Sequence, residues 1–246
     1  MSPQRTSLIQ LADAPALAAR GRDELARIAA AAIAERGSFR IALAGGSTPK
    51  LLYEALASAG DAFDFARWHV YFGDERNVPP DHADSNFRMA SEAWLARGRV
   101  PEAQVHRMRG ELEAARAALE YERELQVSFA TREAPRFDLV LLGMGADGHT
   151  ASLFPGSTAL GESRAFVAAT WVEKLSTHRI TLTLRTLNAA RAVLFLVAGP
   201  DKADALRGVF HGSGDPRALP ARLVQPWDGG VTWLVDRAAA AKLRGD

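Results

Sequence analysis

Short apolar segments that end in glycine recur along this chain of 246 residues, and they constrain its fold more than any other feature. Phe137–Leu142 runs into a turn with three glycines, Phe39–Ala44 into the sequence GGSTP, and Ala192–Ala198 into Gly-Pro. Trp68–Phe72 ends in a similar way, at the sequence GDER. Short apolar runs that are bounded by turn residues are typical of buried strands.

Stretches with helical spacing of apolar residues separate these segments. They begin near Pro15, after the GGSTP turn and after Asp201. Because strands alternate with helices, we expect an α/β fold with one doubly wound, mainly parallel sheet flanked by helices, and residues 1–246 forming a single domain. Residues 112–129 predict a long, charged surface helix whose Leu119 and Leu125 face inward.

Composition narrows the classes of partner. The formal net charge is +1, which gives no field that would attract nucleic acid or a membrane surface. The chain has no cysteine, which excludes disulfides, thiolate nucleophiles and Cys-based metal sites. The first residues lack the pattern of a signal peptide, and no apolar run approaches the roughly 20 residues of a membrane span. We expect a cytoplasmic protein, a monomer or small homo-oligomer, with neither nucleic acid nor membrane as partner.

Gly46, Ser47 and Thr48 stand between a predicted strand and a predicted helix. Free backbone N–H groups at a helix N-terminus, beside two hydroxyls, suit a phosphate group. The segment lacks both the Gly, Lys and Ser/Thr spacing of a P-loop and the GxGxxG of a dinucleotide site. The alternative is a tight turn in which Ser or Thr caps the helix.

Charged residues follow other predicted strands. Arg76 of the GDER sequence offers a planar donor fork for phosphate or carboxylate, and Lys202 stands at a helix start, where an ammonium opposes the helix dipole unless an anion lies nearby. The alternatives are a solvated loop with an internal ion pair, an exposed helix lysine and, for Arg179, an edge residue of a strand. Because the strand ends of a doubly wound sheet share one edge, we expect these groups to converge on a small anionic substrate.

Asp147 and His149 lie one residue apart in the glycine-rich turn after Leu142. An imidazole can take a proton from water near neutral pH, and a nearby carboxylate can fix its tautomer. The alternative is a loop histidine beside an aspartate that caps the turn. The GxSxG sequence of a serine hydrolase is missing, and the other histidines lack the spacing of a metal site.

Four blocks together resemble the 6-phosphogluconolactonase family: ALAGGSTPKLLYEAL, YFGDERNVPPDHADSNFRMA, FDLVLLGMGADGHTASLFPGS and HRITLTLRTLNAARAVLFLVAGPDKADAL. They occur in the family's order between about Ile41 and Leu206. The superfamily also includes glucosamine-6-phosphate deaminases, whose glycine turn continues with a catalytic Glu. Phe154 stands where that Glu would be, which favours the lactonase. The resemblance implies a Rossmann-like fold of the sugar-phosphate isomerase type.

The resemblance also implies roles for residues. His149 would be the general base that activates water to attack C1 of 6-phospho-D-glucono-1,5-lactone, and Asp147 would orient His149 or stabilise its imidazolium. The 6-phosphate and the sugar would be held by Gly46, Ser47, Thr48, Arg76 and Lys202. Asp74 matches a base of the deaminases and would here contact a hydroxyl. Arg179 matches a recurrent family position whose role the resemblance does not define.

No metal or organic cofactor is implied, since hydrolysis of a lactone requires only an activated water and charge stabilisation. The expected activity is hydrolysis of the lactone to 6-phospho-D-gluconate in the oxidative pentose phosphate pathway. Two alternatives remain at this point: a glucosamine-6-phosphate deaminase or isomerase, and a non-catalytic sugar-phosphate sensor on the same fold.

Overall fold

Six parallel strands form the central sheet of the computed structural model, which describes residues 5–97 and 99–243. Their order across the sheet is β1-β9-β8-β5-β2-β3, and every neighbouring pair is parallel. The expected mainly parallel, doubly wound sheet is therefore confirmed. The strands are β1 (Arg5–Leu11), β2 (Phe39–Leu43), β3 (Trp68–Phe72), β5 (Leu139–Leu142), β8 (Ala192–Val197) and β9 (Gly230–Asp236).

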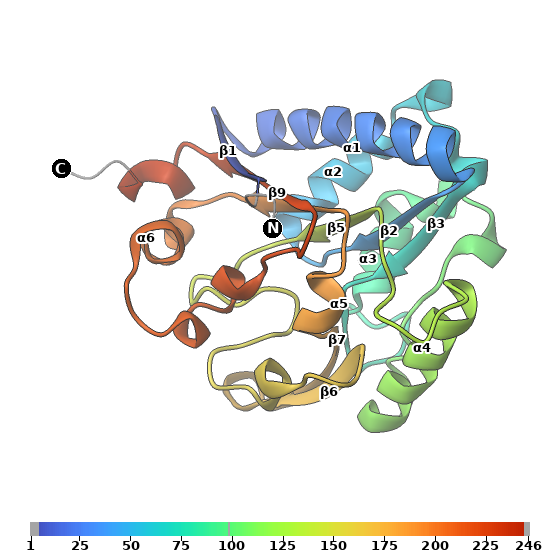
Figure 1. Cartoon of the computed structure of the whole chain (residues 1–246). Coiled ribbons are helices and arrows are strands. Elements are labelled where there is room, and N and C mark those ends of the chain that lie inside the picture. Colours follow the sequence, from blue (N-terminus) through green and yellow to red (C-terminus); the bar gives the residue numbers. More distant parts are fainter. Residues whose placement is uncertain (1–4, 98, 244–246) are drawn as a thin grey trace.

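Helices cover this sheet, and Figure 1 shows α1 and α2 on one side of it with α4 on the other. The first helix begins and ends where the sequence indicates: the Asp13 side chain accepts a hydrogen bond from Ala16 N, Pro15 lies in the first turn, and Gly37 closes the helix at φ 77°. The helices are α1 (Ala14–Arg36), α2 (Ser47–Ala57), α3 (Asn86–Ala93), α4 (Ala114–Ser128), α5 (Leu184–Leu187) and α6 (Ala203–His211).

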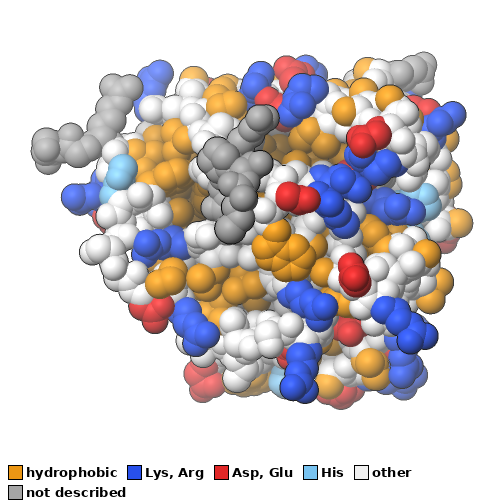
Figure 2. Space-filling model, viewed as in Figure 1, with side chains coloured by type: hydrophobic (Ala, Val, Ile, Leu, Met, Phe, Trp, Pro, Cys, Tyr) orange, Lys and Arg blue, Asp and Glu red, His pale blue; other side chains and the backbone are white. Residues whose placement is uncertain are grey.

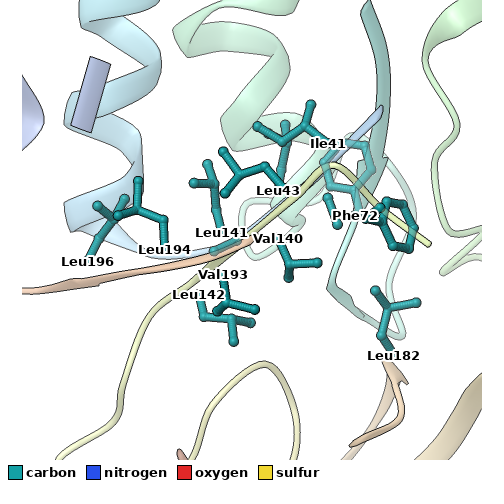
Figure 3. Close-up of a cluster of buried hydrophobic side chains, with 14 of the residues drawn as sticks. Ile41, Leu43, Phe72, Val140, Leu141, Leu142, Leu182, Val193, Leu194 and Leu196 are labelled. Carbon is teal, nitrogen blue, oxygen red and sulfur yellow. The ribbon is translucent and has the colours of Figure 1, made fainter. Parts of the chain in front are cut away.

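The centre of the sheet is apolar on both faces, as the continuous apolar runs predict. Figure 3 shows that successive side chains of β5 and β8 point to opposite sides: Leu141 and Leu194 toward α2, Val140 and Val193 toward Leu182. All five are buried. Because both faces of β5 are covered, its residues can contribute to function only beyond its carboxyl end.

A second sheet, which the sequence did not predict as separate, lies below the first in Figure 1. Its strands run antiparallel in the order β4-β7-β6, with β4 (Asp74–Arg76), β6 (Val167–Val172) and β7 (Thr177–Leu182). The alternative interpretation of the GDER sequence as a solvated loop is wrong, because Asp74–Arg76 form β4. Gly73 connects the sheets, because its N–H donates to the Leu43 carbonyl and its carbonyl accepts from Leu182 N, both at 2.8 Å.

The helix predicted at 112–129 is present as α4, but one of its two inward residues was assigned wrongly. Leu125 is fully buried, whereas Leu119 is 51% exposed. The buried face instead follows small residues and Tyr121, whose hydroxyl accepts a hydrogen bond from Phe72 N at 2.9 Å. Alanines define the inward stripe here, so the larger leucine does not mark it.

Candidate active site

The loops after β2, β5 and β8 meet at one edge of the sheet, because these three strands are neighbours in the order β8-β5-β2. From β2 the chain continues to β3 on one side, while β5 lies on the other, so the direction of winding changes between β2 and β5. Such a switch point opens a crevice beyond the strand ends. A cavity of about 470 Å³ occupies this position. Eight of the nine residues proposed from the sequence line it: Gly46, Ser47, Thr48, Asp74, Arg76, His149, Arg179 and Lys202.

The N-terminus of α2 lines the cavity at the carboxyl end of β2. Gly46 precedes the helix at φ 105°, a conformation that side chains other than glycine rarely adopt, and no side chain caps the helix. The Tyr53 hydroxyl bonds both Ala44 N, at 3.0 Å, and Ala44 O, at 2.7 Å, which fixes the end of β2. Ser47 lies inside the helix rather than capping it. The cavity is therefore lined by a helix start whose N–H groups lack a side-chain acceptor.

Asp147 and His149 form a hydrogen-bonded pair in the glycine turn that follows β5. His149 Nδ1 lies 2.5 Å from Asp147 Oδ1. Burial disfavours the charged form of Asp147, but hydrogen bonds from His149 and Lys174 outweigh it, and the pKa of this carboxyl lies well below its usual range. With the proton on Nδ1, the His149 Nε2 keeps a free lone pair, and it has no hydrogen-bond partner within the described part of the chain.

The absence of a side chain at Gly145 leaves room for the His149–Asp147 pair. A Cβ on Gly145 would lie 2.0 Å from His149 Nδ1 and 2.7 Å from Asp147 Oδ1. The turn is closed by backbone bonds from Gly145 N to His149 O and from Gly148 N to Gly145 O, both 2.9 Å. Asp147 itself does not line the cavity and stands behind His149. It can act on a bound molecule only through the imidazole.

The GDER segment is an ordered strand rather than a solvated loop. Asp74 is 8% exposed and accepts a hydrogen bond from Ser152 Oγ at 2.7 Å. Glu75 makes no ion pair in the described part of the chain. Its carboxylate accepts from the N–H groups of Asn86 and Phe87 at the start of α3. Burial raises the pKa of Glu75, and the backbone hydrogen bonds oppose this rise. Glu75 thus anchors α3 and holds its neighbours Asp74 and Arg76 at the cavity.

Arg76 and Arg179 are direct cross-strand partners in β4 and β7, and both line the cavity. Like charges that lie opposite each other destabilise a sheet unless an anion lies between them. Burial, and then the nearby charge of Arg76, lower the pKa of the Arg179 guanidinium. Neither guanidinium forms an ion pair with the residues that the structure describes. An anion bound between them would remove this repulsion.

The cavity has a strong excess of positive charge. Lys202, at the end of the turn after β8, lines it with a side chain that is 23% exposed and pairs with Asp201 at 2.8 Å. It is therefore not the freely exposed lysine of the alternative interpretation. Asp74 is the one carboxylate among the lining residues, against four cations: Arg76, Lys174, Arg179 and Lys202. This balance favours an anionic ligand.

Two further residues contact the Asp147–His149 pair, and the sequence did not indicate either contact. Lys174, which the sequence did not single out, contacts Asp147 across 27 residues of chain. Phe154, noted only for the carboxylate it lacks, stacks on His149 with ring centroids 4.1 Å apart. A lysine five residues before a strand arginine gives no local signal of this contact, because it depends on how the second sheet packs against the first.

Within residues 5–97 and 99–243, no group of three or more His, Asp or Glu side chains is arranged to hold a metal ion. Over the same residues, no helix has the length and apolar character that crossing a membrane would require. Basic and acidic side chains are interspersed on the face shown in Figure 2.

A family model described as glucosamine-6-phosphate isomerases/6-phosphogluconolactonase matches residues 12–233. The chain belongs to this family. It is 47% identical to the 6-phosphogluconolactonase of Synechocystis over 216 residues, which make up 87% of this chain and 88% of that protein. It is 41% identical to the human 6-phosphogluconolactonase over 213 residues, or 85% and 82% of the two chains. The solved 6-phosphogluconolactonase from Trypanosoma cruzi matches 99% of this chain and 98% of its own, with a TM-score of 0.87 and 30% identity.

The four sequence blocks that resemble 6-phosphogluconolactonases all lie inside the range that the family model matches. In the structure the same blocks supply the α2 start, the β4 strand, the glycine turn, and β7 with the turn after β8. Each of them contributes residues to the cavity. The family resemblance and the cavity thus rest on the same parts of the chain.

Proposed function

We propose that this protein hydrolyses 6-phospho-D-glucono-1,5-lactone to 6-phospho-D-gluconate in the oxidative pentose phosphate pathway. One observation carries the proposal: a single cavity brings a hydrogen-bonded His149–Asp147 pair together with an uncapped helix start and several cations. The relatives named 6-phosphogluconolactonase, at 41–47% identity over most of the chain, support the choice of substrate. The chemistry needs a base for water and a binding site for a phosphate, and the cavity offers both.

His149 is the general base in this proposal. Its Nε2 takes a proton from a water molecule, and the water oxygen forms a bond to C1 of the lactone. The resulting oxyanion collapses, the bond between C1 and the ring oxygen breaks, and the imidazolium returns its proton to that oxygen. Asp147 accepts the Nδ1 hydrogen bond throughout and stabilises the imidazolium while it exists. General base catalysis of this kind contributes about 10²–10⁴-fold.

The substrate is held by its phosphate and its hydroxyls. The N–H groups of Ser47 and Thr48 at the start of α2, together with Arg76 and Lys202, form the phosphate site in this proposal. Asp74 accepts a hydrogen bond from a hydroxyl of the sugar, and the hydrogen bond that it receives from Ser152 holds its carboxylate in place for this contact. Binding at the phosphate places C1 near His149, which converts remote binding energy into correct orientation at the reacting bond.

A deaminase would need a catalytic Glu at the position of Phe154, and this chain has no carboxylate there. Phe154 stacks its ring on the His149 imidazole, so an apolar surface stands there instead. The sensor alternative gives no reason for an imidazole whose Nδ1 is paired and whose Nε2 is free. We further propose that residues 1–246 act as one domain in the cytoplasm. The single hydrophobic core cluster that contains Leu194 of the large sheet and Ile180 of the small one supports the single domain.

The decisive experiment is a lactonase assay on freshly generated substrate, with spontaneous hydrolysis subtracted, for wild type beside His149→Ala. We expect kcat to fall by 10²-fold or more in His149→Ala, while affinity for 6-phosphogluconate is retained. Near wild-type kcat in this variant would refute the assignment of the base. Release of ammonia from glucosamine 6-phosphate would support the deaminase, and product binding without any turnover by wild type would support the sensor.

The phosphate site is tested by separate variants. Arg76→Ala and Lys202→Ala each remove one proposed phosphate contact, and we expect both to raise KM more than they lower kcat. Unchanged KM in both variants would remove the phosphate site from the proposal. The exposed Lys50→Ala, on α2 but outside the cavity, is the matched control and should leave KM unaltered.

A further inference from the structure

Lys174 reaches the active site from the tip of a β-hairpin. Strands β6 and β7 are joined by residues 173–176, which include a 3-10 turn at Glu173–Leu175 closed by Ser176 at φ 46°. Trp171 Nε1 donates to Glu173 at 2.7 Å, which braces the turn from the strand side. This loop geometry presents Lys174 and Leu175 to the cavity, and both residues line it.

The Lys174 ammonium contacts two members of the catalytic group. Its Nζ donates a hydrogen bond to Asp147 Oδ2, and it lies 4.7 Å from the centre of the Phe154 ring. The other oxygen of the carboxylate, Oδ1, is the one bonded to His149 Nδ1. Asp147 is therefore held between an imidazole on one oxygen and an ammonium on the other, and neither oxygen is free to replace the other at His149.

Lys174 differs in this contact from the other charged groups of the site. Other charged groups that face the cavity are Asp74 on β4 and the three cations Arg76, Arg179 and Lys202. Among the described cations, Lys174 is the one bonded to Asp147.

We propose that Lys174 is a positioning residue: by bonding Asp147 Oδ2 it keeps Oδ1 on His149 Nδ1, and so holds the imidazole in the orientation that leaves Nε2 free. This inference rests on the proposed function, in which His149 is the base. It assigns to the hairpin of the small sheet a part in orienting the base. Lys174 itself exchanges no proton with the substrate.

The test is the measurement of kcat and KM at one fixed pH for wild type, Lys174→Met and Lys174→Arg. In Lys174→Met we expect kcat to fall by about two- to fivefold with KM nearly unchanged; the loss is modest because the ion pair is half exposed to solvent. Lys174→Arg keeps a donor for the carboxylate and should restore the wild-type kcat.

Lys50→Met is the matched control. Lys50 is as exposed as Lys174, at 52% against 51%, and also faces a carboxylate, but it lies outside the cavity. Its kcat and KM should equal those of wild type. An unchanged kcat in Lys174→Met, or a raised KM as its main effect, would overturn the proposal, the second outcome showing that Lys174 binds substrate instead.

A second measurement does not depend on turnover. The ring C–H signals of His149 can be recorded by NMR at one fixed pH, and their assignment comes from the signals lost in His149→Ala. Their chemical shifts should change in Lys174→Met and return toward the wild-type values in Lys174→Arg, and unchanged shifts in Lys174→Met would contradict the proposal. If His149→Ala remains active, the base assignment fails whatever Lys174 does; if that variant is inactive and the His149 signals do not move in Lys174→Met, only the role of Lys174 fails.

Discussion

The Phe154 ring lies against the His149 imidazole, with ring centroids 4.1 Å apart and an interplanar angle of 25°. A Cβ on Gly145 would lie 2.0 Å from His149 Nδ1, so only glycine fits beside the imidazole, and Asp147 bonds the same nitrogen. The imidazole is thus fixed by one stacked ring, one close backbone and one hydrogen bond. This leaves Nε2 as the ring nitrogen available to a bound molecule.

We predict that Phe154→Leu lowers kcat by about two- to tenfold, because a stacked aromatic pair contributes about 0.5–1.5 kcal/mol to the orientation of its members. KM should change little, since Phe154 carries no polar group for the phosphate. Phe166→Leu is the matched control: Phe166 is also buried and also lies under a cation, Arg185 at 4.8 Å, but it is not part of the cavity. It should lower the free energy of unfolding without lowering kcat, and equal losses of kcat in both variants would contradict the prediction.

Gly145→Ala should abolish most activity while leaving the protein folded. The added methyl would lie 2.0 Å from His149 Nδ1, so the imidazole must move away from Asp147. We expect kcat to fall by about 10²-fold or more, as for loss of the base itself. The control is Gly161→Ala, where nothing lies within 4 Å of the added methyl. Circular dichroism and steady-state kinetics on both variants test this, and a Gly145→Ala enzyme with wild-type kcat would show that the pair is not needed in this geometry.

Arg179→Met should improve stability and impair binding. Removing one of two like charges on opposite strands should raise the free energy of unfolding by about 0.2–1 kcal/mol in the absence of ligand. Losing a charge-assisted hydrogen bond to an anion should raise KM by roughly tenfold or more. Urea unfolding with and without inorganic phosphate separates the two effects, because phosphate should stabilise wild type more than the variant. A variant with unchanged KM would place the anion away from Arg179.

Much of the large sheet was predictable because its strands are continuous apolar runs with glycine at their ends. Leu139–Leu142 and Ala192–Val197 are examples, and their signal is local. The small sheet was harder, because β4 contains only the charged residues Asp74–Arg76 and is a strand solely through its pairing with β7. Leu119 was misassigned for a related reason: the buried face of α4 consists largely of alanines, which carry a weak hydrophobic signal.

Some residues of the candidate site were likewise predictable from local sequence, and others were not. Residues in motifs at strand ends, such as Ser47 and His149, were predictable because parallel strands bring their carboxyl ends to one edge. Lys174 was not, because its contact with Asp147 depends on the packing of a hairpin that belongs to the other sheet. Arg179 was noted as a charged strand residue, but its position opposite Arg76 follows from a register that the sequence of either strand alone does not define.

Asp147 should make the stability of the protein depend on pH at the acidic end. The pKa of its carboxyl is held below the ordinary value of 3.8 in the folded state, against the effect of burial, by the hydrogen bonds from His149 and Lys174. When a folded-state pKa is depressed, the stabilisation is fully present above the unfolded value and is lost as the pH falls through the folded one. Urea unfolding of wild type and Asp147→Asn at pH 5, 4 and 3 measures this directly. We expect the advantage of wild type over Asp147→Asn to be largest at pH 5 and to shrink at pH 3, because the unfolded wild type then takes up a proton that the folded form resists. A difference that stays constant from pH 5 to pH 3 would show that Asp147 is stabilised by packing rather than by its charge.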